Sequence, residues 1–323
     1  MTQDWRVIVP EPKHDVVLAA LQSAFDGRAI ESAEIITGGA SGALPVRLVV
    51  AGKSYLLRLE GPRRVMRNPH QYTCMRIAAE AGAAPALHYV DDGEGIAIID
   101  FVAQQPLHEY PGGAVELMRA LSRLARTLQD ATPFPAYGDY LVLVRRLLAH
   151  LETRFAPGLL EAHHECLERL CEGVPWDVST HVSSHNDPNP RNILFDGKRL
   201  WLVDWETAYR NDPYVDMAIL VDNFAPTPEL EQAFLSSWPR APLSAEQVTR
   251  FHAIKALTRL YYAGLLIALS GASNTLITDL VAPTPHEFQA SIVRGELSPA
   301  SAETRVVLGK MCLAGFLAAA MAL

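Results

Sequence analysis

The segment HNDPNPRNILF, residues 185–195, places groups that accept protons and bind metal ions in front of an apolar run. Its two prolines favour an extended loop without regular backbone pairing. The chain continues with Asp-Gly-Lys-Arg and then LWLVDWE, and two apolar runs around an Asp-Gly turn predict a β-hairpin. Such a hairpin returns Asp204 to the loop that holds Asp187 and Asn192.

These three side chains suit phosphoryl transfer from a nucleotide. That reaction needs a carboxylate to accept the proton of the attacking hydroxyl, and an amide and a second carboxylate to hold Mg²⁺ against the phosphates. Oxygen ligands are the ones that Mg²⁺ prefers. We therefore predict Asp187 as the catalytic base and Asn192 and Asp204 as metal ligands, with ATP and Mg²⁺ as cofactors.

A structural interpretation of the same residues also exists, because Asp and Asn are ordinary loop residues before a strand. The full pattern is more restrictive than the pair alone. It consists of H-x-D-x-x-x-x-N, an apolar strand, a turn and a second apolar strand that ends in D-W-E. This combination favours a kinase-type site over an ordinary loop.

The stretches HNDPNPRNILF and WLVDWETAYRNDPYVDMA resemble the catalytic segment of the aminoglycoside phosphotransferase and choline kinase superfamily. Within it they look most like the choline/ethanolamine kinase branch. The resemblance implies a protein-kinase-like fold and the same roles for the base and the metal ligands. It also implies that Asp216 is a buried aspartate that braces the catalytic loop, with His185 and Glu206 in supporting positions.

A glycine-rich stretch, ITGGASGALPV, precedes the second candidate strand and is a candidate phosphate-covering loop. Glycines let backbone amides approach phosphates, and a serine hydroxyl can donate a hydrogen bond. A hairpin turn is the structural alternative. The predicted nucleotide-binding residues of this loop are Gly38, Gly39, Ser41 and Gly42.

Arg58, in SYLLRLE, stands where the superfamily carries a lysine or arginine for the nucleotide phosphates. Its planar guanidinium can donate hydrogen bonds to two oxygens at once. The acidic partner expected on the next helix falls at Gln71, which can orient Arg58 but cannot neutralise it. Glu60 and Glu80 are alternative partners. This departure leaves open a nucleotide-binding module with little turnover.

The segment IIDFVAQQPL resembles the hinge of the superfamily. By that resemblance, backbone groups of Asp100 to Val102 bind adenine. Any strand that leaves a lobe is an alternative interpretation of this segment.

The elements that position these residues change in kind along the chain. Candidate strands and two helices fill the first hundred residues, whereas long amphipathic helices follow from about residue 104. A capping box, Ser244 with Gln247, begins one of them. We predict an α+β, bilobal protein-kinase-like fold, with a nucleotide-binding lobe at residues 1–103 and a helical catalytic and substrate-binding lobe at residues 104–323.

The composition limits the partners. The 323 residues carry a formal net charge of −8, which argues against nucleic acid or an anionic membrane. Four scattered cysteines suggest a reducing compartment, and we predict a cytoplasmic protein. The apolar C-terminal segment 311–323 is shorter than a span of about 20 residues needs, so we expect a buried helix there. The oligomeric state stays open.

A zinc site is the alternative for EAHHECLERLC, but these residues lie on one predicted helix without a second ligand pair. The acceptor hydroxyl is harder to predict. An aromatic box with Asp222 suits a quaternary ammonium, and carboxylates such as Glu229, Glu231 and Glu246 suit an aminoglycoside. The box candidates, which also suit core packing, are Tyr209, Tyr214, Phe224, Trp238, Tyr261 and Tyr262.

The predicted activity is ATP- and Mg²⁺-dependent transfer of the γ-phosphate to an alcohol group. We expect an amino alcohol such as choline or ethanolamine as the acceptor. An aminoglycoside, a sugar, thiamine or homoserine is the alternative within the same fold.

Overall fold

The computed structural model describes residues 4–36, 43–61, 68–239, 241–271 and 275–323. The chain divides into two compact units. The first contains the residues up to Tyr137 together with Ser183–Arg210, and the second contains Gly138–Val182 together with Asn211–Leu323.

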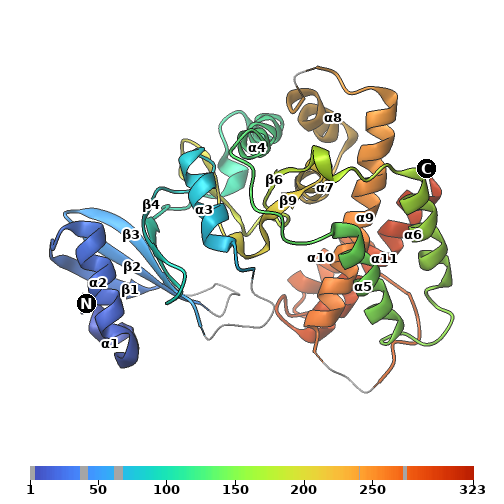
Figure 1. The fold of residues 1–323 in the computed structure, drawn as a ribbon. Coiled ribbons are helices and arrows are strands. Elements are labelled where there is room, and N and C mark those ends of the chain that lie inside the picture. Colours follow the sequence, from blue (N-terminus) through green and yellow to red (C-terminus); the bar gives the residue numbers. More distant parts are fainter. Residues whose placement is uncertain (1–3, 37–42, 62–67, 240, 272–274) are drawn as a thin grey trace. The chain divides into compact units, whose positions relative to one another are not determined.

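A five-stranded antiparallel sheet is the centre of the first unit, in the order β1-β2-β3-β5-β4 (Figure 1). The strands are β1 (Ile30–Ile35), β2 (Leu44–Val50), β3 (Lys53–Leu59), β4 (Leu87–Asp91) and β5 (Ile96–Asp100). Ala51 and Gly52 both have positive φ, at 48° and 72°, which is the geometry of a tight hairpin turn between β2 and β3. The candidate strands expected in the first hundred residues are confirmed, and β4 and β5 pair as an antiparallel hairpin.

Two helices close one side of this sheet, namely α1 (Trp5–Ile8) and α2 (His14–Phe25). Val17, Ala20, Leu21 and Phe25 recur at helical spacing on α2, and all four are buried. They belong to one apolar cluster with side chains of the strands, so the amphipathic pattern of the sequence builds this core. The strand members of the cluster are Ala33, Val46, Leu48, Val50, Leu57, Leu59, Ile96 and Ile98.

The rest of the first unit surrounds a short hairpin. Its elements are α3 (Gln71–Glu80), η2 (Leu107–Glu109), α4 (Gly113–Gln129), β7 (Ile193–Phe195), β8 (Leu200–Leu202) and η4 (Trp205–Thr207). The short strands β6 (Val182–Ser184) and β9 (Tyr209–Asn211) fall at the division, with Val182 and Asn211 counted in the second unit. The β7–β8 pair is the hairpin expected around the Asp-Gly turn, with Ile193 opposite Leu202.

Backbone hydrogen bonds tie this hairpin to the N-terminal part of the chain. The N–H of Leu202 donates to Ala83 O at 2.8 Å, and the N–H of Gln105 donates to Phe195 O at 2.7 Å. These bonds explain why residues 183–210 group with the sheet in one unit although they lie far along the sequence. The functional boundary near residue 103 stays a prediction.

Helices make up the second unit, in which α9 (orange in Figure 1) is the longest. They are α5 (Tyr140–Glu152), α6 (Glu161–Gly173), η3 (Val178–Thr180), α7 (Pro213–Phe224), α8 (Pro228–Ser237), α9 (Ala245–Leu269), α10 (Pro285–Val293) and α11 (Ala302–Met321). Ser244 and Gln247 form the predicted capping box at the start of α9, with bonds of 3.2 and 2.9 Å. An α+β chain with a strand-rich N-terminal sheet and a helical C-terminal part is therefore confirmed.

The last helix is longer than the sequence suggested. The apolar segment 311–323 belongs to α11, which is the one helix among the described residues long and apolar enough to cross a membrane, with a mean hydropathy of 1.5. The length argument against a span is thus wrong. One face of α11 packs on α9, where a Cβ at Gly309 would lie 2.6 Å from Ile267, but only 28% of the apolar window is buried, so the expected buried helix is found only in part. The cytoplasmic location stays a prediction.

His163 of α6 is fully buried and stacks on Phe316 of α11, with ring centroids 6.0 Å apart. Burial lowers the pKa of His163 to about 4. An unfolded chain binds a proton at this residue below about pH 6.5, whereas the folded chain stays neutral until about pH 4, so stability falls as the pH drops through this range.

We expect His163→Phe to remove this dependence. The wild type should lose up to about 1.4 kcal/mol per pH unit more than the variant between pH 6 and pH 4.5. Urea midpoints of both proteins at several pH values measure the difference. Parallel pH profiles would contradict it.

Candidate active site

The loop before β7 is held in shape by its own side chains. Asn192 donates from Nδ2 to the backbone O of Asp187 at 2.9 Å and to its carboxylate Oδ2 at 3.3 Å. The N–H of Asn192 in turn donates to Asn189 O at 3.0 Å. Because the amide nitrogen is used in this way, the Oδ1 of Asn192 remains an acceptor.

The β7–β8 hairpin brings Asp204 beside this loop. The N–H of Val203 donates to Asn192 O at 3.0 Å, so the residue before Asp204 is bonded directly to the loop. Asp204 itself adopts φ 70° and ψ 75°, a left-handed conformation that is rare outside glycine. The structure therefore brings together Asp187, Asn192 and Asp204, while their chemical roles stay predictions.

Two buried residues hold the beginning of the loop. His185 donates from Nε2 to Val203 O at 2.9 Å and packs on the Trp205 ring, with centroids 4.8 Å apart. Asn186 has φ 64° and donates from Nδ2 to Thr207 O at 3.0 Å and Tyr209 O at 3.3 Å. The two side chains thus fasten the loop to the chain on both sides of Asp204.

Arg58 of β3 pairs with two carboxylates. Its Nη1 and Nη2 each lie 3.1 Å from Asp204 Oδ1. Its Nε lies 2.9 Å from Glu60 Oε1, although the Nε–H does not point at that oxygen, so this contact is ionic rather than a directed hydrogen bond. Burial works against the charge of Arg58, but Asp204, Glu60 and Glu206 outweigh burial and raise its pKa.

Gln71 also contacts Glu60. It is the first residue of α3, only 5% exposed, and its Nε2 lies 3.5 Å from Glu60 Oε1. The anion closest to Arg58 Nε is therefore Glu60, the residue directly after β3, and Gln71 contacts that anion.

A cavity of about 650 Å³ in the first unit lies over these groups. Its polar lining includes Arg58, Glu60, Gln71, Asn192, Asp204 and Glu206, and its apolar lining includes Ile36, Leu56, Tyr72, Met75, Ala97, Ile99 and Leu194. An apolar hollow with a few convergent charged groups is typical of a small-molecule site.

The predicted hinge also lines this cavity. The side chain of Asp100 is occupied by Lys53 Nζ at 2.8 Å and His88 Nε2 at 2.7 Å, and these bonds outweigh burial and lower its pKa. The backbone N–H groups of Asp100 and Phe101 donate within the sheet, to Ala86 O and Ser54 O. Within the described residues, this leaves the backbone of Val102 as the hinge group without such a bond.

Gly38, Gly39, Ser41 and Gly42 fall outside the described residues. Asp216 is buried in the first turn of α7, in the second unit, and its support of the catalytic loop stays a prediction.

The sequence analysis left out one residue that matters for the loop. Asn186 stood in the motif, but its own role was missed. The signal was its type, because asparagine tolerates positive φ better than most residues and carries two donors.

Three of the aromatic-box candidates, Tyr209, Tyr214 and Tyr261, are buried. Tyr214 packs at a tilt against Trp238, and Tyr261 packs at a tilt against Tyr140. Asp222 accepts two bonds of 2.8 Å from Arg259, so its charge is already matched.

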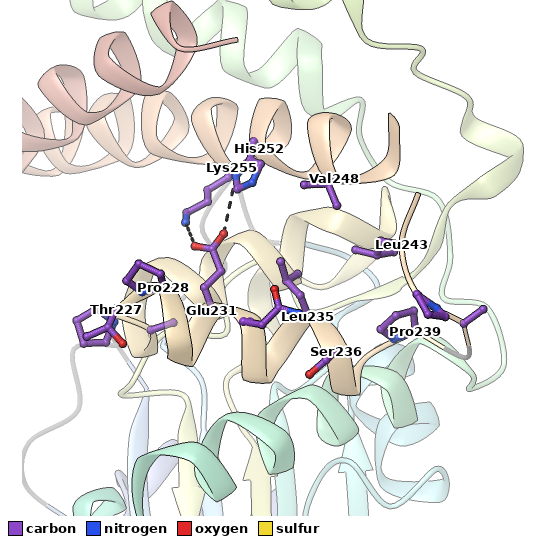
Figure 2. A pocket seen from close by; sticks show the side chains of 15 residues that line it. Thr227, Pro228, Glu231, Leu235, Ser236, Pro239, Leu243, Val248, His252 and Lys255 are labelled. Atoms are coloured by element: carbon purple, nitrogen blue, oxygen red, sulfur yellow. Dashed lines mark hydrogen bonds and ion pairs between the residues drawn. The ribbon is translucent and has the colours of Figure 1, made fainter. Parts of the chain in front are cut away.

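The second unit has a hollow of its own between α8 and α9, about 950 Å³ in volume (Figure 2). Glu231 points into it toward Lys255 and His252, and Lys255 Nζ lies 2.6 Å from Glu231 Oε2. Glu231, one of the carboxylates considered for an aminoglycoside, is therefore already paired.

Comparisons with known proteins agree with the family and the fold expected from the sequence. A model of the phosphotransferase enzyme family, APH, matches residues 33–252. A curated relative from Metamycoplasma hominis, itself uncharacterised, is 33% identical over 125 residues, which are 38% of this chain and 24% of that protein. The chain thus spans about a quarter of the length of this relative.

Solved structures share the fold at low identity. A choline/ethanolamine kinase family protein from Mesorhizobium loti is 19% identical with a TM-score of 0.63, over 94% of this chain and 98% of that one. Choline kinase LicA from Streptococcus pneumoniae is 16% identical with a TM-score of 0.64, over 94% and 100%. Spectinomycin phosphotransferase, solved with ADP and spectinomycin, is 14% identical with a TM-score of 0.55, over 92% and 98%. The predicted superfamily and fold are confirmed.

Substitution of Asn186 tests how the loop is held. Asn186→Ala removes the hydrogen bonds to Thr207 O and Tyr209 O. It also puts alanine, which adopts positive φ less readily than asparagine, at φ 64°. We therefore expect a loss of about 2 kcal/mol in unfolding free energy. Asn186→Gly removes the same bonds but accepts the backbone, and should lose less. Urea denaturation measures both, and an alanine variant as stable as the glycine variant would argue against a strained backbone here.

Proposed function

The chain belongs to the APH phosphotransferase enzyme family, and from this premise we propose that it transfers the γ-phosphate of ATP to the hydroxyl of a small molecule. The observation that carries the proposal is the convergence of Asp187, Asn192 and Asp204 at the end of one hairpin, beside a cavity that Arg58 also lines. Two carboxylates, an amide and a guanidinium at one place are the groups that phosphoryl transfer uses.

Asp187 is the proposed base. The Nδ2 of Asn192 donates to both the backbone oxygen and the carboxylate of Asp187, which restricts the side chain of Asp187. A fixed base transfers a proton without first losing conformational freedom.

Asn192 and Asp204 fit a magnesium ion. The amide of Asn192 offers Oδ1, because Nδ2 is bonded to Asp187, and Asp204 offers a carboxylate whose Oδ1 accepts from Arg58 Nη1 and Nη2. Hard oxygen ligands in small number are what Mg²⁺ takes from a protein. When bound there, the ion would neutralise charge on the phosphate oxygens.

Arg58 is the proposed phosphate-binding cation, and its five donors suit two phosphate oxygens at once. The backbone of Val102 is the proposed adenine contact at the other end of the same cavity. The nucleotide would therefore extend from the hinge to the hairpin within the first unit.

For the acceptor we propose an amino alcohol of the choline and ethanolamine kind. Support comes from the His-Asn-Asp and Asp-Trp-Glu pattern and from structural neighbours that are choline kinases. An aminoglycoside is the second candidate, supported by the spectinomycin phosphotransferase neighbour. The pairing of Asp222 with Arg259 means that Asp222 would have to release an arginine before it could bind a cation.

The test is consumption of ATP with Mg²⁺ across choline, ethanolamine, thiamine, homoserine, sugars and aminoglycosides. We expect turnover with one class, and a fall of about 10² to 10⁴ in rate for Asp187→Asn, which cannot accept the proton. Asp15→Asn, which removes an exposed carboxylate from the first turn of α2, is the matched control and should keep the wild-type rate.

Full turnover in Asp187→Asn would overturn the assignment of the base. Binding of Mg·ATP without turnover of any acceptor would instead favour the nucleotide-binding module.

A further inference from the structure

Glu60 follows β3 directly and is fixed on both its backbone and its side chain. Its N–H donates to Gly95 O at 2.8 Å, and its side chain is only 13% exposed. The carboxylate oxygen Oε1 lies 2.9 Å from Arg58 Nε. Residues two apart on a strand face the same side, so strand geometry alone keeps Glu60 beside Arg58.

The same oxygen also lies 3.5 Å from Nε2 of Gln71 of α3. Arg58 and Gln71 therefore share one carboxylate oxygen as their partner. A second carboxylate at position 71 would face Glu60 across that short gap and repel it. The amide of Gln71 avoids this repulsion and can donate a hydrogen bond.

We propose that Glu60 is the positioning anion for Arg58 and that Gln71 acts through Glu60. This inference rests on the proposed function. Kinases generally place an acid on the helix after the third strand to hold the phosphate-binding cation. Here the acid directly follows the strand and a neutral donor begins the helix, so the two residue types are in exchanged places.

Different nitrogen atoms of the Arg58 guanidinium contact the two carboxylates. Glu60 lies against the Nε side, whereas Nη1 and Nη2 both point at Asp204 Oδ1. When phosphate oxygens replace Asp204 as partners of the two Nη groups, Glu60 keeps the Nε side in place. The cation is then oriented within a single strand, without help from a carboxylate on α3.

An exchange of the two residues tests the proposal. Glu60→Gln leaves Arg58 without its strand anion, and Gln71→Glu sets two carboxylates side by side. We expect each single variant to raise the Kd for Mg·ADP about tenfold, and the double variant Glu60→Gln with Gln71→Glu to return within about threefold of wild type. Glu60→Asp, which keeps the charge with a shorter reach, should lie between wild type and Glu60→Gln.

Calorimetric titration with Mg·ADP measures these constants, and the thermal midpoint of each variant shows whether it is folded. Glu80→Gln is the matched control, because it removes a carboxylate from the last residue of the same helix, and it should bind as wild type does. If the losses in Mg·ADP affinity of the two single variants simply add in the double variant, the role of Glu60 is overturned. The same holds if Glu60→Gln binds Mg·ADP with unchanged affinity. Either result leaves the proposed function intact. A wild type that does not bind Mg·ADP would overturn both.

Discussion

The ion pair between Arg58 and Asp204 is the contact on which the arrangement of the site depends. It joins residues 146 positions apart, one on the third strand of the sheet and one at the end of the β7–β8 hairpin. The two side chains are 21% and 29% exposed, so each carries a charge that is partly removed from water. Loss of either partner would leave the other charge poorly solvated, which costs more than the pair itself contributes.

The position of Asp204 is determined from several directions. The β7–β8 register fixes the position of Asp204 at the end of the hairpin. The hydrogen bond from the N–H of Val203 to Asn192 O holds it next to the loop. Its left-handed backbone conformation then directs the side chain toward Arg58. Backbone conformations of this kind persist where the surroundings hold them, and they concentrate at functional sites. The same carboxylate is the proposed metal ligand, so Arg58 and a divalent cation would compete for Asp204.

The hairpin and the position of Asp204 could be predicted from local signals in the sequence. The Asp-Gly turn between two apolar runs predicts the hairpin, and the hairpin alone places Asp204 near Asn192. The capping box at Ser244 is equally local, and it is confirmed. Contacts between distant parts of the chain leave no such signal. The partner of Arg58 could not be chosen among Gln71, Glu60 and Glu80, because that choice depends on where α3 packs.

Two other features lay beyond the sequence for the same reason. The grouping of residues 183–210 with the N-terminal sheet depends on hydrogen bonds such as Leu202 to Ala83, which no periodicity reveals. The length of α11 was underestimated because the apolar composition of residues 311–323 was taken as the whole helix, whereas the N-cap is Ser301.

Binding of Mn²⁺ to nucleotide-free protein tests most directly whether Asp204 exchanges an arginine for a metal ion. Electron paramagnetic resonance of free Mn²⁺ would give the Kd of wild type, Arg58→Gln and, as control, Arg191→Gln, which removes a second cation that lines the same cavity. The account predicts that Arg58→Gln binds Mn²⁺ about tenfold more tightly than wild type, because the competitor for Asp204 is gone, and more tightly than Arg191→Gln. Equal affinity in Arg58→Gln and Arg191→Gln, or weaker binding in Arg58→Gln, would contradict it.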